Sequence, residues 1–236
     1  MGFHISESQF DTWLTQQQKT YHIYAPIWYA GGNTFSDVDC IRYGIVNKIS
    51  DIVFDKKSEY SFKDVLTPIS QTLFFFTEDQ CKESAPPKKG TVIFLRSCDL
   101  HALKRLDDMY LKNGSPDYYY QRIRDNIKIV LIGCNQSFEN CFCVSMGTNI
   151  SENYDMSVNA IDGSYEINCK NDEWEHFFTD MKASRLYSIF PRTDHTSIIY
   201  SFDGDPSQHK QNPHMADKSW PSVGFYNVTI DMLLIK

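Results

Sequence analysis

Four cysteines of this chain fall close enough together in the sequence to act as one set of ligands: Cys98, Cys134, Cys141 and Cys143. The chain has seven cysteines in all, and residues 1–25 lack the apolar core of an export signal. An odd number of cysteines in such a chain is more easily explained by thiolate ligands or reduced thiols than by disulfides. Four thiolates suit either a cubic iron–sulfur cluster or a tetrahedral structural zinc ion.

The spacing of these cysteines favours iron over zinc. Structural zinc usually takes two pairs of cysteines spaced by two to four residues, whereas this chain has one Cys-Phe-Cys pair, Cys141–Cys143. We therefore predict one [4Fe–4S] cluster, with a zinc-binding structural or interaction module as the alternative. Buried thiols without a metal are a third interpretation, because free cysteine packs as a small hydrophobe. The isolated cysteines are predicted not to be ligands: Cys40, Cys81 and Cys169.

The most regular part of the sequence predicts a β-α-β unit around two of these cysteines. Thr91–Ser97 and Ile127–Gly133 are apolar runs of strand length, and Asp99–Leu111 between them has apolar residues at helical spacing. Two such strands should be parallel, with a right-handed crossover. Cys98 and Cys134 then follow the ends of two strands at one edge of the sheet, where open α/β sheets place their ligands.

Cys98 falls at the N-terminus of the predicted helix, where unpaired N–H groups and the helix dipole favour a thiolate. Hydrogen bonds and burial set the reduction potential of a cluster, so Arg96, Phe138 and Phe142 are candidates for tuning it. Arg96 is equally consistent with a position on the surface.

The N-terminal part is predicted to mix helix and strand. A helix is expected over residues 7–18, capped by Ser6, and a strand over Tyr21–Tyr29. Ile41–Phe54 combines short extended pieces with a helical turn. The run Phe74–Phe76 is expected either in the core or in a buried interface with another domain.

A hairpin and a helix are expected after the cysteines. Val158–Ile161 and Tyr165–Asn168 flank Asp162-Gly163, a strong hairpin signal, and Trp174–Tyr187 is predicted to be helical. The polar, proline-containing stretch 203–222 predicts a loop or a disordered linker.

These elements place the chain in the α/β class, as a mixed α+β arrangement. A mixed N-terminal region precedes a β-α-β unit whose parallel strands carry the cysteine-ligated cluster at one sheet edge. Residues 1–190 are predicted to form an iron–sulfur-binding α/β domain, which a break at residues 86–90 would divide into two subdomains. Residues 191–236 are predicted to be an atypical tail, truncated or disordered.

Composition argues against several classes of partner. The formal charge is −7 and the isoelectric point is near 5.5, whereas a nucleic-acid-binding surface is basic. No apolar run approaches the roughly 20 residues that span a bilayer. We therefore expect a cytoplasmic protein with neither nucleic acid nor membrane as a partner.

Two stretches of the sequence resemble the signatures of the iron–sulfur electron-transfer subunit of anaerobic sulfite reductase. Arg96–Asp107 contains Cys98, and Ser137–Thr148 contains the Cys-Phe-Cys pair. The related hydrogenase β-subunits share the Cys-Asp and Cys-Phe-Cys elements. The wider family to which this resemblance points is a set of iron–sulfur electron carriers.

The resemblance implies an electron-transfer subunit of an oxidoreductase complex that is not catalytic alone. It would relay electrons from an NADH- and flavin-using subunit toward a siroheme subunit that reduces sulfite to sulfide, with FAD and siroheme on those partners only. The family's C-terminal half carries two ferredoxin-like cysteine runs, but this chain has no cysteine after Cys169. We therefore expect a single cluster and a chain truncated after about residue 190. A hydrogenase β-type electron-transfer subunit is the alternative.

Overall fold

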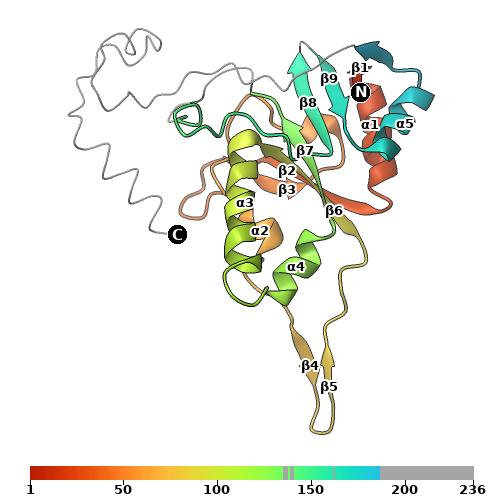
Figure 1. The fold of residues 1–236 in the computed structure, drawn as a ribbon. Coiled ribbons are helices and arrows are strands. Elements are labelled where there is room, and N and C mark those ends of the chain that lie inside the picture. Colours follow the sequence, from red (N-terminus) through yellow and green to blue (C-terminus); the bar gives the residue numbers. More distant parts are fainter. Residues whose placement is uncertain (135–137, 139–140, 162, 187–236) are drawn as a thin grey trace, which may run out of the picture.

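The computed structural model describes residues 1–134, 138, 141–161 and 163–186. These residues form an eight-stranded sheet with helices on both faces, and a separate two-stranded hairpin (Figure 1). The strands are β1 Gly2–Ser6, β2 Tyr21–Tyr29, β3 Cys40–Ile45, β4 Phe74–Phe76, β5 Cys81–Glu83, β6 Gly90–Arg96, β7 Ile127–Ile132, β8 Met156–Ile161, β9 Ser164–Cys169 and β10 Ser184–Leu186. The helices are α1 Glu7–Gln17, the 3-10 turn η1 Ile49–Asp51, α2 Lys63–Leu66, α3 Ser97–Leu111, α4 Tyr118–Arg124 and α5 Asp172–Asp180.

The large sheet is mixed, with a parallel centre. Its strand order is β10-β1-β9-β8-β7-β6-β2-β3, and the neighbours β2, β6, β7 and β8 run parallel. The remaining pairs are antiparallel. The predicted α/β class, the parallel β-α-β unit and the hairpin of β8 and β9 are thus confirmed. Strands from both sides of residues 86–90 belong to this one sheet.

Each face of the sheet is buried by its own group of helices. Along β6, Val92 and Phe94 pack into a core with α1 and α5, whereas Ile93 and Leu95 pack into a second core with α2, α3 and α4. Successive side chains of a strand point to opposite faces, so a strand buried on both faces is continuously apolar. The apolar residues of β6 therefore contribute to both cores, one on each face of the sheet.

Capping side chains define where helices α1 and α4 begin. Helix α1 begins as expected at Ser6, whose Oγ accepts the Gln9 N–H at 3.3 Å while the Ser6 N–H donates to Gln9 Oε1 at 3.0 Å. This reciprocal pair satisfies two of the N–H groups that a helix start leaves unpaired. Helix α4 is capped by Asp117, which accepts the Tyr120 N–H at 2.7 Å.

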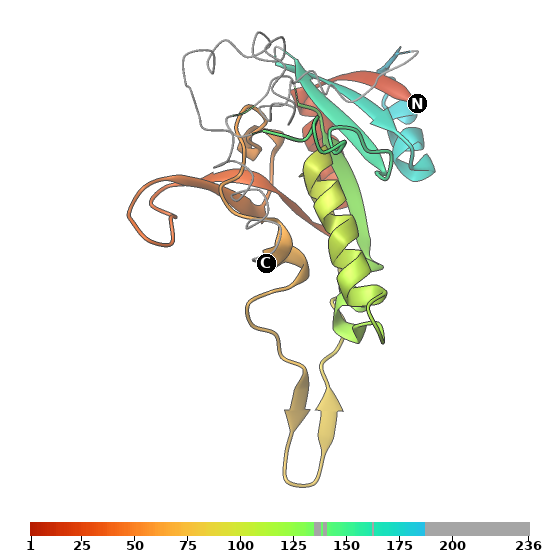
Figure 2. The same ribbon diagram turned by 60° about the vertical axis from the view of Figure 1, so that its left-hand side comes forward.

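The aromatic run Phe74–Phe76 is not in the core of the described chain. It forms β4 of the hairpin with β5, which extends away from the sheet and its helices (Figure 2). The three side chains are between 52% and 82% exposed. The prediction of a core position is therefore wrong, because within the described residues the two strands of the hairpin pair only with each other. A buried interface with another domain stays a prediction.

The helix predicted over Trp174–Tyr187 is shorter than expected. Helix α5 ends at Asp180, and Lys182 adopts a left-handed conformation with φ of 54°. The N–H groups of Lys182 and Ala183 then bond back to Thr179 O and Phe178 O, which is the Schellman pattern of a helix end. The chain turns there into β10, an edge strand paired with β1.

Helices of membrane-spanning length and apolarity are absent from the described residues. The predictions for residues 187–236, including the linker over 203–222, lie outside the described residues.

Candidate metal centre

The first two cysteines are placed by the register of β6 and β7. Arg96 pairs with Ile132 in the parallel ladder, and Cys98 and Cys134 each follow two positions later. Both thiols therefore lie at the carboxyl edge of the same two strands. This is the placement that the sequence predicts, and it arises because parallel strands end at the same edge of a sheet.

The second two cysteines come from the loop that follows β7. The Cys141 N–H donates to Phe138 O at 3.1 Å, and the Thr148 N–H donates to Cys143 O at 2.8 Å. His101 on α3 bonds to Ile150 O at 2.8 Å. Figure 1 shows this green loop beside the N-terminal end of α3, where Cys98 lies. The loop is thus folded back on itself and linked to the helix that carries the first cysteine.

The four thiols lie within electrostatic reach of one another. Burial raises the pKa of Cys98, and the charges of Cys134 and Cys143 raise it further. Burial also raises the pKa of Cys134 and of Cys143, and a thiolate at Cys141 adds to both shifts. Mutual repulsion of this kind occurs only between groups that are near one another. The fold therefore brings Cys98 near Cys134 and Cys143, and it brings Cys141 near the same two thiols.

The expected effect of the helix terminus on the Cys98 pKa is outweighed by burial and by a neighbouring carboxylate. Cys98 does lie in the first turn of α3, where the helix dipole favours a thiolate. The Cys98 pKa is nevertheless raised, because burial and the neighbouring Asp99 disfavour a negative sulfur. A metal-bound thiolate gains its stability from the cation, so binding has to release the proton.

Arg96 is buried, and the alternative of a surface position is therefore wrong. Its side chain is 3% exposed and its Nη1 donates to Cys134 Sγ at 3.3 Å. The positive charge of Arg96 lowers the Cys134 pKa against the larger effect of burial. A cation thus lies against one of the four sulfurs.

Tyr43 and Asp99 form a second polar contact at this edge, which the sequence did not indicate. Asp99 Oδ2 accepts the Tyr43 hydroxyl at 3.3 Å and the Arg96 N–H at 3.4 Å. Burial raises the Asp99 pKa, whereas the Arg96 N–H and its positive charge lower it. Asp99 at the third helical position is typical of a residue that caps a helix start, but nothing in the sequence connects Tyr43 on β3 to it.

The donor set fits a thiolate-bound iron–sulfur cluster in its chemistry. Four sulfurs, a buried arginine donor and the amide groups of a helix start all suit an anionic sulfur-ligated group. The Ser97 hydroxyl, beside Cys98, is buried without a hydrogen-bond partner among the described residues. Within the same residues, no group of three or more His, Cys, Asp or Glu side chains is placed so that it could hold a single metal ion.

The three isolated cysteines lie elsewhere. Cys40 and Cys169 are buried, the latter in the core with α1 and α5, and Cys81 is exposed on the hairpin. Burial raises the pKa of Cys169 to about 12. These surroundings agree with structural or exposed thiols.

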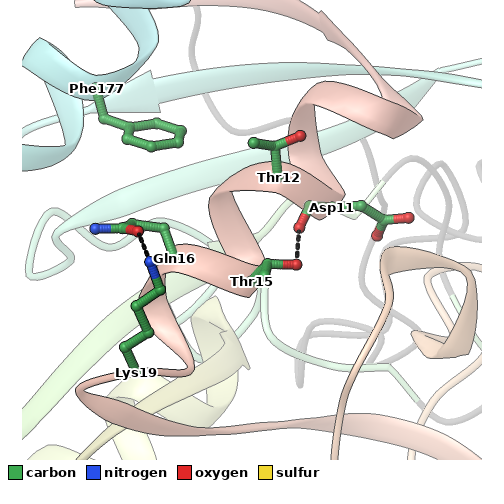
Figure 3. Close-up of a pocket in the computed structure, with 6 residues that line it drawn as sticks. All are labelled: Asp11, Thr12, Thr15, Gln16, Lys19 and Phe177. Atoms are coloured by element: carbon green, nitrogen blue, oxygen red, sulfur yellow. Dashed lines mark hydrogen bonds between the residues drawn. The ribbon is translucent and has the colours of Figure 1, made fainter.

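A shallow pocket of about 410 Å³ lies between α1 and α5, and none of the four cysteines lines it. Figure 3 shows two hydrogen bonds among the residues that line it. Thr15 Oγ1 donates to Asp11 O at 2.8 Å, and Lys19 Nζ donates to Gln16 Oε1 at 2.8 Å. The pocket brings together no set of side chains for acid–base or nucleophilic chemistry.

One comparison with known proteins finds a distant relative. Over 147 residues the chain is 28% identical to sulfhydrogenase 2 subunit beta of Pyrococcus furiosus. The matched region makes up 62% of this chain and 41% of the relative. The chain thus spans less than half the length of that protein. No family model matches the chain, and no solved structure matches it either.

Proposed function

We propose that this chain is an electron-transfer subunit of an oxidoreductase complex, with one [4Fe–4S] cluster held by Cys98, Cys134, Cys141 and Cys143. The observation that supports the proposal is the position of Cys98 and Cys134 just past the carboxyl ends of the paired strands β6 and β7, where the buried Arg96 donates to Cys134 Sγ. The distant similarity to a sulfhydrogenase β-subunit supports the same class of function.

The roles of this chain's own residues follow from their positions. Cys98 and Cys134 would offer sulfurs from just past the ends of two core strands, and the loop after β7 would supply the other two. The cluster, once bound, would supply one-electron transfer. Burial around Cys134 and Cys143, each 9% exposed, keeps water away from the sulfurs. The resemblance to an electron carrier implies that this chain performs no bond chemistry on a substrate by itself.

The more specific proposal is a relay within an anaerobic sulfite reductase complex. It rests on Arg96–Asp107 and Ser137–Thr148, which resemble the signatures of that complex's iron–sulfur electron carrier. Electrons would then come from an NADH- and flavin-using partner and pass to a siroheme partner, with FAD and siroheme on those subunits. A second candidate is an electron-transfer subunit of hydrogenase type. The similarity to a sulfhydrogenase β-subunit supports it as well as it supports the sulfite reductase relay.

The first experiment measures iron, acid-labile sulfide and zinc in the protein purified without oxygen. About four irons and four sulfides per chain, with a paramagnetic signal on reduction, are expected. About one zinc and no sulfide would replace the proposal with the zinc-binding scaffold.

A second experiment separates the two candidate complexes. The tagged chain is expressed in its natural host and recovered anaerobically with its associated proteins. A co-purifying siroheme chromophore and NADH-dependent sulfite reduction would identify the sulfite reductase relay. Hydrogen-dependent reduction of a dye by a complex without siroheme would identify the hydrogenase type.

A further inference from the structure

Arg96 has an unusual environment for a charged side chain. It is the last residue of β6 and directly precedes α3, and it is 3% exposed. Its Nη2 donates to Phe54 O at 2.9 Å and to Lys56 O at 2.8 Å, and the Phe138 ring centroid lies 4.6 Å from its guanidinium carbon. Its Nη1 donates to Cys134 Sγ. The guanidinium is thus held in one orientation by the backbone, with one nitrogen directed at a predicted ligand.

The charge of Arg96 is only partly balanced by these contacts. A buried cation is costly unless an anion or several acceptors compensate for the lost water. Two carbonyls supply dipoles and the Phe138 ring supplies its electron-rich face, and no carboxylate of the described residues forms an ion pair with the guanidinium. Asp99 accepts the main-chain N–H of Arg96 at 3.4 Å. A full negative charge beside Arg96 would therefore be best accommodated at Cys134 Sγ, the sulfur to which Nη1 donates.

We infer that the Arg96 guanidinium raises the reduction potential of the cluster by donating to Cys134 Sγ, an inference that rests on the proposed function. Reduction adds one negative charge to the cluster, and a fixed positive charge at hydrogen-bond distance from a ligand sulfur stabilises that form more than the oxidised form. The low dielectric of a buried site strengthens the interaction. Arg96 acts on the cluster through the ligand and not as a ligand itself.

The test compares midpoint potentials of Arg96→Gln, Arg96→Lys and the wild type in anaerobic redox titrations. In Arg96→Gln the ratio of reduced to oxidised cluster at the wild-type midpoint should fall about tenfold, or about 59 mV for one electron. Arg96→Lys keeps the charge and should lie nearer the wild type. Arg105→Gln is the matched control, because it removes an exposed charge from the same helix, where solvent and salt screen it. Equal potentials in Arg96→Gln and the wild type would overturn the inference.

A second measurement uses the wild-type protein and does not depend on a variant that folds. The protein is grown with arginine labelled with nitrogen-15 in the guanidinium, reduced, and studied by pulsed paramagnetic resonance. A nitrogen-15 coupling to the cluster is expected, and its absence would overturn the inference. Iron and sulfide content measured on the same sample separates the failure of the proposed function from the failure of this inference. A sample without a cluster contradicts the proposed function. A cluster without the coupling contradicts only the role of Arg96.

Discussion

Arg96 lies directly opposite Ile132 in the parallel register of β6 and β7, and this pairing sets the relative positions of the two cysteines that follow them. Cys98 and Cys134 are far apart in sequence but occupy equivalent places past the ends of adjacent strands. A shift of register by one residue would reverse the face of every side chain in the strand. Burial on both faces of the sheet resists such a shift. The packing of the core therefore determines the spacing between these two thiols.

Replacing one predicted ligand should remove or degrade the cluster, whereas replacing an isolated cysteine should not. Cys141→Ser loses one of four thiolates, so the anaerobically purified variant should contain less iron and sulfide and absorb less visible light. Cys81→Ser is the matched control on the exposed hairpin, and Cys169→Ser is a second control in the core. Equal cluster content in all three variants would contradict the ligand assignment.

The exposed phenylalanines of the hairpin should contribute little to the stability of the isolated chain. Phe75 is 60% exposed, so Phe75→Ser should change the free energy of unfolding by less than about 0.5 kcal/mol. Phe178 is fully buried in contact with Trp13 and Phe3, so Phe178→Ala should cost about 3–5 kcal/mol. Urea unfolding of both variants measures the difference. A large loss in Phe75→Ser would show that the hairpin packs against the body of the protein.

Asp155 should be important for stability because it joins three elements. Its carboxylate accepts the Ile129 N–H at 2.9 Å and the Lys128 ammonium at 3.1 Å, and its main-chain oxygen accepts the Asn171 N–H at 3.1 Å. Asp155→Ala leaves a strand N–H without its partner and should cost about 1–3 kcal/mol of the free energy of unfolding.

The matched control for Asp155 is Asp125→Ala, an exposed carboxylate at the end of α4. Its loss should lie within about 0.5 kcal/mol of the wild type. Chemical denaturation followed by circular dichroism gives both values. Equal stability of the two variants would show that the contacts of Asp155 contribute nothing.

Burial of Cys169 predicts a loss of stability at high pH. Its pKa is raised from 9.0 to about 12 in the folded chain, so the unfolded state ionises first. The stability contributed by the neutral thiol is complete below pH 9 and is lost as the pH rises toward 12. Over that window, the free energy of unfolding of the wild type should fall relative to Cys169→Ala by up to about 1.4 kcal/mol per pH unit. Urea titrations at several pH values would contradict this if both proteins gave the same slope.

Local sequence patterns predicted the central part of this fold correctly. The apolar runs of β6 and β7, the helical spacing of Leu100, Leu103 and Leu106, and the cap at Ser6 are each determined by residues near one another in the chain. The placement of Cys98 and Cys134 followed directly, because parallel strands joined by a helix must end at one edge.

Other features depended on contacts between distant segments. Strand β1 was not expected, because Gly2–Ser6 is stabilised by insertion between β9 and β10 near the other end of the described chain. The end of α5 was misplaced because Lys182, and not the usual glycine, adopts the left-handed conformation there.

The sequence by itself determined the central β-α-β unit and predicted four sulfurs as ligands, while the tertiary structure decided the surroundings of those sulfurs. Arg96 is buried because Phe54 and Lys56, from another part of the chain, supply carbonyls to its guanidinium. Phe74–Phe76 are exposed because, in the part of the chain that the structure describes, their hairpin pairs with no strand of the large sheet. Burial depends on which segments meet in space, and hydrophobic and charged side chains alike take their environment from partners that no local pattern specifies.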